Sequence, residues 1–268
     1  MQRHINKAEA EATFQFHYNN APDGMGAVRA NIMRLLRSVD LVGWTSHEES
    51  GRLDRKALTR FATGSTTVFK RRSIKEAESS AVSILIDCSG SMNWHGRDTK
   101  AHPIIIQLAK LLDRANVDYA VNGFNGGSRM VSLQDGDHST CDEETLNWIP
   151  FKAWNESIQK AAPKLGSFLG WIGSSTPDYS GLNAAIEDLS LRNNPRKILF
   201  FVTDADNYEK EHMRHLQKVA DYHGILLIAL GIDAAHISKV FKHGVSISND
   251  GNFSAVAFNH LLTSLRRA

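Results

Sequence analysis

The sequence contains few cysteines, and this limits what can hold the fold together. Only Cys88 and Cys141 occur in 268 residues, and no CxxC pair is present. Disulfide frameworks and structural zinc sites need more cysteines at defined spacings, so we expect a hydrophobic core and two reduced thiols, as in a cytosolic protein. A chain of this length buries about 70–75% of its unfolded surface, which is enough for such a core.

Long hydrophobic runs and a strong net charge are also missing. No stretch reaches the ~18 apolar residues that a membrane-spanning helix needs. Residues 1–11 are polar and charged, unlike a signal peptide. The formal net charge is only +2, so the overall charge does not favour nucleic-acid binding. The expectation is a soluble, cytoplasmic protein with neither a membrane nor a nucleic-acid partner.

Short apolar runs without alternation are the clearest structural signal in the chain. Residues 82–86, 197–203 and 224–230 are almost wholly apolar, which is typical of strands buried on both faces of a parallel sheet. Segments with helical spacing lie between these runs. We therefore predict an α/β fold, with a doubly wound, mostly parallel sheet and helices on both of its faces.

A change in composition at residues 73–80 suggests a boundary between two parts of the chain. Before it, apolar residues recur at helical spacing over 25–39 and 53–61, which predicts a small helical N-terminal extension covering 1–80. The α/β domain is expected over 81–268. Within that domain, we expect a turn at Gly126–Gly127 and a mostly helical segment over 146–168.

The apolar run at 82–86 ends abruptly in side chains that carry oxygen. Asp87, Ser89 and Ser91 follow it, at the sheet edge where open α/β folds bind ligands. Carboxylate and hydroxyl oxygens suit Mg²⁺, although the same residues can also form a capping turn that satisfies helix N–H groups. A second apolar strand also ends in an acid, Asp204 after Thr203, and this favours a metal site.

A third segment can complete the same site. Residues 171–180 form a loop of small residues that contains Thr176. If the two acid-terminated strands are neighbours, this loop can bring a hydroxyl to their shared edge. The predicted ligands of one divalent ion, Mg²⁺ or alternatively Ca²⁺ or Mn²⁺, are Asp87, Ser89, Ser91, Thr176 and Asp204.

The segment Asp87–Met92 reads DCSGSM and resembles the metal-ion-dependent adhesion site motif, DxSGSM, of von Willebrand factor A (VWA) domains. In that family, a threonine from a small-residue loop and an aspartate at the end of a later strand complete the site, and Thr176 and Asp204 match these positions. The resemblance implies a protein-binding module that is not catalytic by itself. It also implies that the bound ion accepts an Asp or Glu carboxylate from a protein partner.

From about Gly51 the chain also resembles the C-terminal part of the CobT subunit of aerobic cobaltochelatase, through the stretches GRLD at 51–54 and VFKRR at 68–72. This resemblance implies an AAA+ ATPase partner of the MoxR or CobS type. Any ATP hydrolysis would come from that partner, since the sequence has no GxxxxGK[ST] motif. The alternative is a chelatase-like subunit that assists ATP-dependent metal insertion into a tetrapyrrole. Short chains of this kind occur in bacteriophages, where the location would be the host cytoplasm.

Other residues near the motif have simpler expected roles. Trp94 is the best candidate for a partner contact, because tryptophan is enriched at interaction hot spots. Cys88 is expected to be a small buried residue beside the strand, and His95 and His102 to lie at the surface near the site. A haloacid-dehalogenase type of phosphatase is disfavoured, because the second acid of its DxDx[TV] motif falls at Ser89.

Overall fold

The computed structural model describes residues 6–20, 44–57, 59, 64, 66–72, 80–131, 141–204 and 209–247. The chain divides into two compact units, one formed by Met1–Leu36 with Ser79–Ala268 and the other by Arg37–Glu78. The helix predicted at 25–39 lies outside the described residues.

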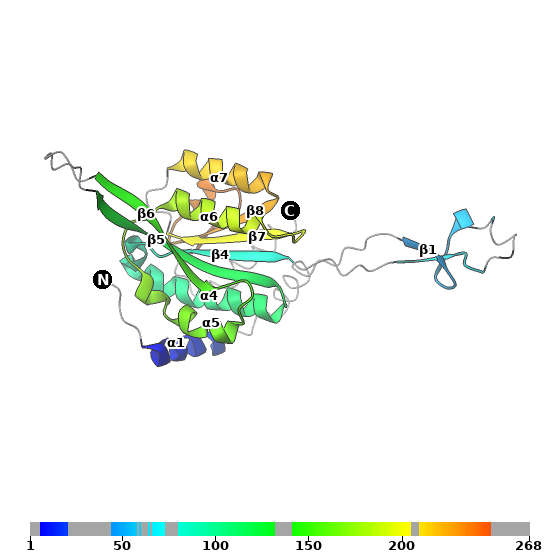
Figure 1. The fold of residues 1–268 in the computed structure, drawn as a ribbon, viewed down its shortest axis with the longest axis horizontal. Helices are drawn as coiled ribbons and strands as arrows, with labels where there is room; N and C mark the ends of the chain where they lie inside the picture. Colours follow the sequence, from blue (N-terminus) through cyan, green and yellow to red (C-terminus); the bar gives the residue numbers. More distant parts are fainter. Residues whose placement is uncertain are drawn as a thin grey trace. The chain divides into compact units, whose positions relative to one another are not determined.

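The larger unit is built on one six-stranded sheet with the order β6-β5-β4-β7-β8-β9 (Figure 1). All neighbouring strands are parallel except β5 and β6, which pair antiparallel at one edge. The prediction of a doubly wound, mostly parallel α/β sheet is therefore confirmed. The strands are β4 (Ala81–Asp87), β5 (Asp118–Val131), β6 (Cys141–Lys152), β7 (Lys197–Thr203), β8 (Ile225–Ile232) and β9 (Gly244–Ile247).

Helices cover both faces of this sheet, as Figure 1 shows. One core lies under α1 (Lys7–Asn19), α4 (Arg97–Arg114) and α5 (Ile158–Gly166), and the other under α6 (Asp178–Ser190), α7 (Lys210–Tyr222) and α8 (Ile237–Val240). Strand β4 is buried along its whole length and serves both cores. Because successive strand side chains point to opposite faces, Ile84 and Ile86 join the first core and Leu85 joins the second.

The N-terminal helix α1 packs against the α/β domain. Phe14 is buried in the first core, and the backbone of Ala10 lies so close to Gly166 of α5 that a side chain there would collide with it. A glycine at position 166 is therefore required for this close approach of two helices. The structure groups α1 with the domain that the sequence predicted to begin at residue 81.

The segment predicted to be mostly helical, 146–168, is only partly so. Strand β6 continues to Lys152, and the helix α5 is confined to Ile158–Gly166. Pairing with β5 overrides the apolar spacing, since Ile149 pairs with Gly123 and Leu146 pairs with Gly126. Gly126 is consequently a strand residue and does not form the expected turn. It is needed because a side chain there would collide with Ser175.

The smaller unit forms a three-stranded antiparallel sheet in the order β1-β3-β2. Its strands are β1 (Trp44–Glu48), β2 (Arg52–Leu53) and β3 (Phe69–Arg72), with one 3₁₀ turn, η2, at Arg55–Ala57. The helix predicted at 53–61 is found only in part among the residues described: Leu53 belongs to a strand, Arg55–Ala57 form the 3₁₀ turn, and Thr59 is helical. Leu53 pairs with Phe69 across the sheet, and the Asp54 carboxylate accepts a hydrogen bond from the Lys56 N–H, which starts the 3₁₀ turn.

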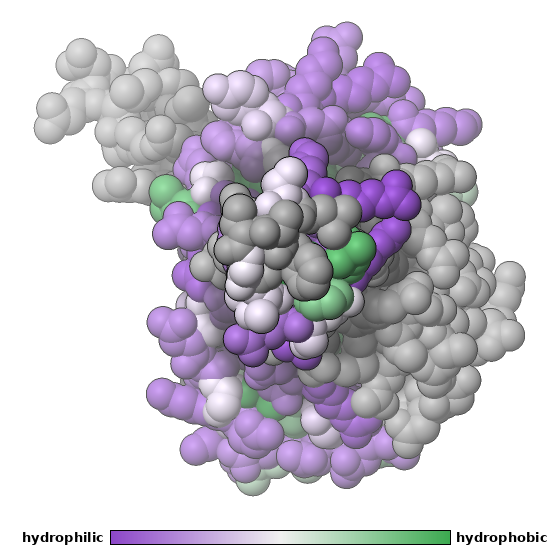
Figure 2. Space-filling view, turned by 90° about the vertical axis from the view of Figure 1, so that its right-hand side faces the viewer, coloured by the Kyte–Doolittle hydropathy of each residue, from purple (hydrophilic) through white to green (hydrophobic). Residues whose placement is uncertain are grey.

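Among the residues that are coloured by hydropathy in Figure 2, hydrophilic ones predominate, and the hydrophobic ones form only small patches. Within the described residues, no helix is both long and apolar enough to cross a membrane.

Candidate metal-binding site

The candidate site lies where strands β4 and β7 end side by side. The two strands are parallel neighbours, and Ile86 pairs with Val202. The residues that follow this pair, Asp87 on one strand and Thr203–Asp204 on the other, therefore meet at one edge of the sheet. The chain order reverses between β4 and β7, so this edge is the topological switch point at which α/β sheets bind ligands.

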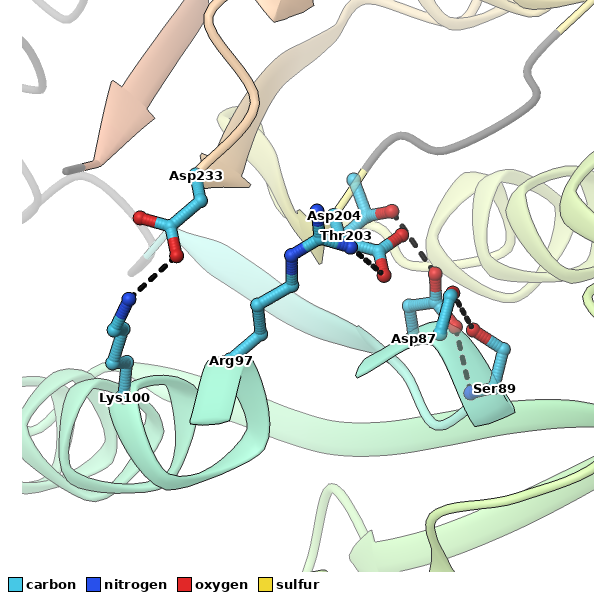
Figure 3. A network of polar contacts seen from close by, with 8 residues as sticks. Asp87, Ser89, Arg97, Lys100, Thr203, Asp204 and Asp233 are labelled. Carbon is cyan, nitrogen blue, oxygen red and sulfur yellow. Dashed lines mark hydrogen bonds and ion pairs between the residues drawn. The ribbon is translucent and has the colours of Figure 1, made fainter. Parts of the chain in front are cut away.

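Asp87 is held in one orientation by hydrogen bonds to both carboxylate oxygens. Its side chain is buried, Oδ1 accepts a hydrogen bond from the Ser89 N–H at 2.8 Å, and Oδ2 accepts one from the Thr203 hydroxyl at 3.0 Å (Figure 3). The Thr203 bond joins the ends of the two strands across the switch point. Hydrogen bonds of this kind to a charged group are stronger than those between neutral groups.

The serine hydroxyls of the motif face each other. The Oγ atoms of Ser89 and Ser91 lie 3.0 Å apart, with Ser89 buried and Ser91 partly exposed. Ser89 stands at the N-cap position of the 3₁₀ helix η3 (Gly90–Gly96), yet its side chain makes no capping hydrogen bond there. The capping explanation therefore does not account for this hydroxyl, which remains beside Ser91.

Asp204 brings a second buried carboxylate to the same edge. Its Oδ2 accepts a hydrogen bond from the Arg97 guanidinium at 3.0 Å, and the Asp204 side chain is only 1% exposed. Figure 3 shows Arg97 reaching from the start of α4 toward this acid. The site thus contains two carboxylates and one guanidinium.

The two carboxylates influence each other electrostatically. The pKa of Asp87 is raised to about 6, first because burial penalises the charged form and second because Asp204 carries a like charge. Hydrogen bonds from Ser89 and Thr203 oppose this shift, but they do not cancel it. The ionised form of Asp87 is therefore less favoured in this site than it is in water.

The loop that carries Thr176 lies against the serine motif. The Gly90 N–H donates to the Ser174 carbonyl at 3.0 Å, and the Gly173 N–H donates to the Cys88 carbonyl at 2.9 Å. Thr176 itself accepts a hydrogen bond from the Asp178 N–H through its carbonyl, at the start of α6. The structure brings Asp87, Ser89, Ser91 and Asp204 together. The loop that carries Thr176 contacts the serine motif at Gly173 and Ser174, and no described hydrogen bond joins the Thr176 side chain to either acid.

Sequence reasoning missed two residues of this site, Arg97 and Thr203. Thr203 directly precedes the predicted ligand Asp204, so its position at the strand end was visible, although its bond to Asp87 was not. Arg97 lies 107 residues from Asp204 in the chain, and no local pattern connects the two.

Three predictions for the surrounding residues can be compared with the structure. Trp94 is 62% exposed, so its side chain is accessible at the surface, and Cys88 is fully buried beside Gly123, as expected. The prediction for His102 is wrong, because helix α4 begins at Arg97 and turns this side chain into the core. Its Nε2 lies 2.9 Å from the Leu165 carbonyl, and burial lowers its pKa to about 4.

The candidate site depends on hydroxyl groups as well as acids. Among the described residues, no group of three or more His, Cys, Asp or Glu side chains is placed to hold a metal ion. A cation at the switch point would therefore have to use the serine hydroxyls in addition to the two carboxylates.

Comparisons with known proteins give only distant similarity. No protein-family model and no curated protein matches the chain. Among solved structures, proximal thread matrix protein 1 from the mussel byssus is 15% identical with a TM-score of 0.48, and the match covers 70% of this chain and 48% of that one. The von Willebrand factor type A structure from Catenulispora acidiphila is 16% identical with a TM-score of 0.44, covering 71% and 43%.

The manganese-loaded TRAP protein of Plasmodium vivax is 14% identical with a TM-score of 0.47, and the match covers 70% of this chain and 72% of TRAP. The chain spans about half the length of the mussel protein and less than half of the Catenulispora structure. Because identity and TM-score are both low, the fold assignment depends on the sheet topology itself.

Proposed function

We propose that this chain is a metal-dependent protein-binding module of the VWA type, an adaptor that works with an AAA+ ATPase of the MoxR or CobS type. The observation that carries the proposal is the meeting of two buried carboxylates, Asp87 and Asp204, with the hydroxyl pair of Ser89 and Ser91. They meet at the edge of the sheet where this class of fold binds ligands.

The chemistry of the site fits a hard divalent cation. All of its candidate ligands are oxygens, which Mg²⁺, Ca²⁺ and Mn²⁺ prefer. Burial and, second, the like charge of Asp204 raise the pKa of Asp87, and a bound cation would offset the repulsion between the two carboxylates. The residues that would hold the ion are Asp87, Ser89, Ser91, Thr176 and Asp204. The ion would supply a concentrated positive charge that attracts a carboxylate of the partner.

The chain itself orients the ligands and controls access to them. The Ser89 N–H and the Thr203 hydroxyl fix the carboxylate of Asp87. Ser89 and both acids are buried, whereas Ser91 is partly exposed, so the site opens to solvent on the side of η3.

Two features near the serine loop offer surface to a partner: the exposed Trp94 and an uncharged cavity with both polar and apolar lining. Trp94 projects from η3, and a cavity of about 310 Å³ lies between strands β5–β6 and the loop that includes Gly173 and Ser174. No charged side chain lines this cavity, which includes Trp148 and Trp171. A partner segment that presents a carboxylate beside an apolar side chain would match this surface.

Support for an ATPase partner comes from the smaller unit. The two stretches that resemble CobT, GRLD and VFKRR, contribute β2 and β3, and Arg52 and Leu53 pair with Lys70 and Phe69. The matching stretches therefore form one paired element of the structure, although thirteen residues separate them in the chain. This element is the part of the chain that we assign to the ATPase complex.

The metal site is tested by titrating the full chain with Mn²⁺ and measuring free Mn²⁺ by electron paramagnetic resonance. We expect saturable binding of one ion, which Asp87→Ala abolishes. Asp233→Asn is the matched control, because Asp233 also follows a strand of the same sheet but pairs with Lys100. Saturable Mn²⁺ binding of equal affinity in native protein and Asp87→Ala would show that the metal site is elsewhere.

The partner is tested with an AAA+ ATPase encoded beside this chain's gene. The tagged chain is expected to capture the ATPase or its client in Mg²⁺ and to release it in EDTA. Capture that is unchanged by EDTA would refute the metal-dependent mechanism. Cobalt insertion by a reconstituted mixture with a tetrapyrrole-binding subunit would instead favour the chelatase-like alternative.

A further inference from the structure

A positively charged side chain already contacts one of the proposed metal ligands. Arg97 is the first residue of α4, and its guanidinium donates to Asp204 Oδ2 at 3.0 Å. The Arg97 side chain is 12% exposed and that of Asp204 is 1% exposed, so this ion pair is shielded from water. At such a pair the interaction between charges is much less screened than at the surface.

We infer that Arg97 sets the metal affinity of this site by competing with the cation for Asp204, an inference that rests on the function proposed above. An oxygen that accepts a hydrogen bond from a guanidinium has less negative charge to offer a metal ion. The guanidinium also repels a divalent cation that binds nearby. Both effects weaken metal binding.

The backbone before α4 fixes Arg97 in this position. His95 and Gly96 both have positive φ values, 56° and 68°, and they form the kink that separates η3 from α4. The Thr99 hydroxyl donates to the Gly96 carbonyl at 2.7 Å and ties the kink to the first turn of α4. Arg97 is therefore presented toward Asp204 by a defined turn, and its contact does not depend on a flexible surface segment.

Competition between Arg97 and a divalent ion means that Asp204 has two alternative partners. Without a divalent ion, Arg97 compensates the charge of Asp204, so two neighbouring buried carboxylates do not face each other alone. With an ion, the same guanidinium opposes binding, so occupancy requires a higher concentration of the ion. The adaptor would then bind its partner's carboxylate only where divalent ions are abundant, and it would release the ion easily.

A second cation on the same helix provides the matched control. Lys100 lies three residues after Arg97 on α4 and pairs with Asp233 at the end of β8 (Figure 3). Both side chains of this pair are 26% exposed, and neither belongs to the proposed metal site. Removing the charge of Lys100 changes the net charge of the protein by the same amount as removing that of Arg97.

The test compares Mn²⁺ dissociation constants of the full chain, measured by electron paramagnetic resonance, for native protein, Arg97→Met, Arg97→Gln, Arg97→Lys and Lys100→Met. Loss of the Arg97 charge is expected to tighten Mn²⁺ binding by about tenfold or more. Arg97→Lys keeps the charge and should stay near native, as should Lys100→Met. Arg97→Gln keeps a hydrogen-bond donor, so it provides a second neutral variant if Arg97→Met does not fold.

Weaker or unchanged Mn²⁺ binding in both neutral variants would overturn the inference, and weaker binding would make Arg97 a residue that positions Asp204. Binding that appears only in the neutral variants would support the inference, because competition would then be complete in native protein. Failure of the proposed function is distinguishable. In that case neither native protein nor the neutral variants would bind Mn²⁺ in a way that depends on Asp87.

Discussion

The ends of β7 and β8 offer a direct comparison within one sheet. Each of these parallel neighbours leads into an acid, Asp204 after β7 and Asp233 after β8, and each acid pairs with a cation from α4. The Lys100–Asp233 pair has the shorter distance, 2.5 Å against 3.0 Å for Arg97–Asp204. By distance alone, the β8 end would hold the stronger interaction.

Burial and neighbouring groups reverse this order. The β8 pair is a quarter exposed, and exposed ion pairs contribute about 0–1 kcal/mol to stability. The β7 pair is buried beside a second carboxylate, Asp87, and beside the hydroxyls of Ser89 and Thr203. An acid at the end of a strand is therefore insufficient to indicate a site. What distinguishes the β7 end is that several polar groups are buried together there.

Removing each cation should separate the two ends most clearly. Arg97→Met leaves a buried carboxylate without its ion pair, which typically costs about 3–5 kcal/mol of unfolding free energy. Lys100→Met should cost less than about 1 kcal/mol, because Asp233 can be solvated. Urea denaturation in EDTA measures both. Similar losses for the two variants would mean that burial does not distinguish these pairs.

The same two variants can be compared again after a divalent ion is added. If the site binds a cation, 10 mM Mg²⁺ should restore stability to Arg97→Met, because a ligand that binds only the folded state stabilises it by mass action. Lys100→Met should gain no more than native protein does. Equal gains in both variants would contradict the assignment of the metal to the β7 end.

The pH dependence of stability gives the next largest difference. The pKa of Asp87 is about 6 in the folded protein, against 3.8 ordinarily, so between these values the folded state holds a proton that the unfolded state has released. Stability from this group is therefore full below pH 3.8 and is lost as the pH rises through 6, by up to about 3 kcal/mol.

The control for this pH effect uses one substitution at each strand end. In EDTA, Asp87→Asn should remove the loss of stability between pH 4 and 6.5, since the amide does not titrate in this range. Asp233→Asn should still lose stability over this pH range, as native protein does. A native profile that Asp87→Asn leaves unchanged would show that another group is responsible.

Much of the fold could be predicted from the sequence because buried strands have a strong local signature. The apolar runs that became β4, β7 and β8 each need to be buried on both faces, and this fixes a parallel sheet. Strand β6 and the small sheet at 44–72 could not be predicted in the same way. Their strand conformation depends on pairing with distant residues, as when Leu53 pairs with Phe69.

The candidate site also combines residues that short sequence patterns predict with a residue that only the tertiary structure reveals. Asp87, Ser89 and Ser91 lie within five residues, and Asp204 ends a recognisable strand, so all four could be predicted. Arg97 could not, because its contact with Asp204 depends on the kink at His95–Gly96 and on how α4 packs over the sheet. The residue that we infer to control metal affinity is thus the one that sequence patterns do not reveal.

A smaller effect is expected at Thr203, which joins the two strand ends. Thr203→Val removes the hydroxyl that donates to Asp87 Oδ2 at 3.0 Å, and loss of such a charged hydrogen bond costs about 1.5–3 kcal/mol. Thr145→Val is the control, because the Thr145 hydroxyl donates to the Gly127 carbonyl at an exposed position. Urea denaturation should show little change for the control. Equal losses would mean that the Asp87 bond is no stronger than a surface hydrogen bond.

The smallest change in stability is expected at Thr176, whose loop contacts the residues that follow β4 through the backbone. Gly90 and Gly173 hold that loop by main-chain hydrogen bonds, so Thr176→Val should alter the unfolding free energy by less than about 0.5 kcal/mol. If the hydroxyl is a ligand, the Mn²⁺ dissociation constant should nevertheless rise by about tenfold. An unchanged constant would remove Thr176 from the ligand set and leave a site built from the β4 and β7 ends alone. Metal affinity that changes while stability does not would show that this loop contributes to binding and not to folding.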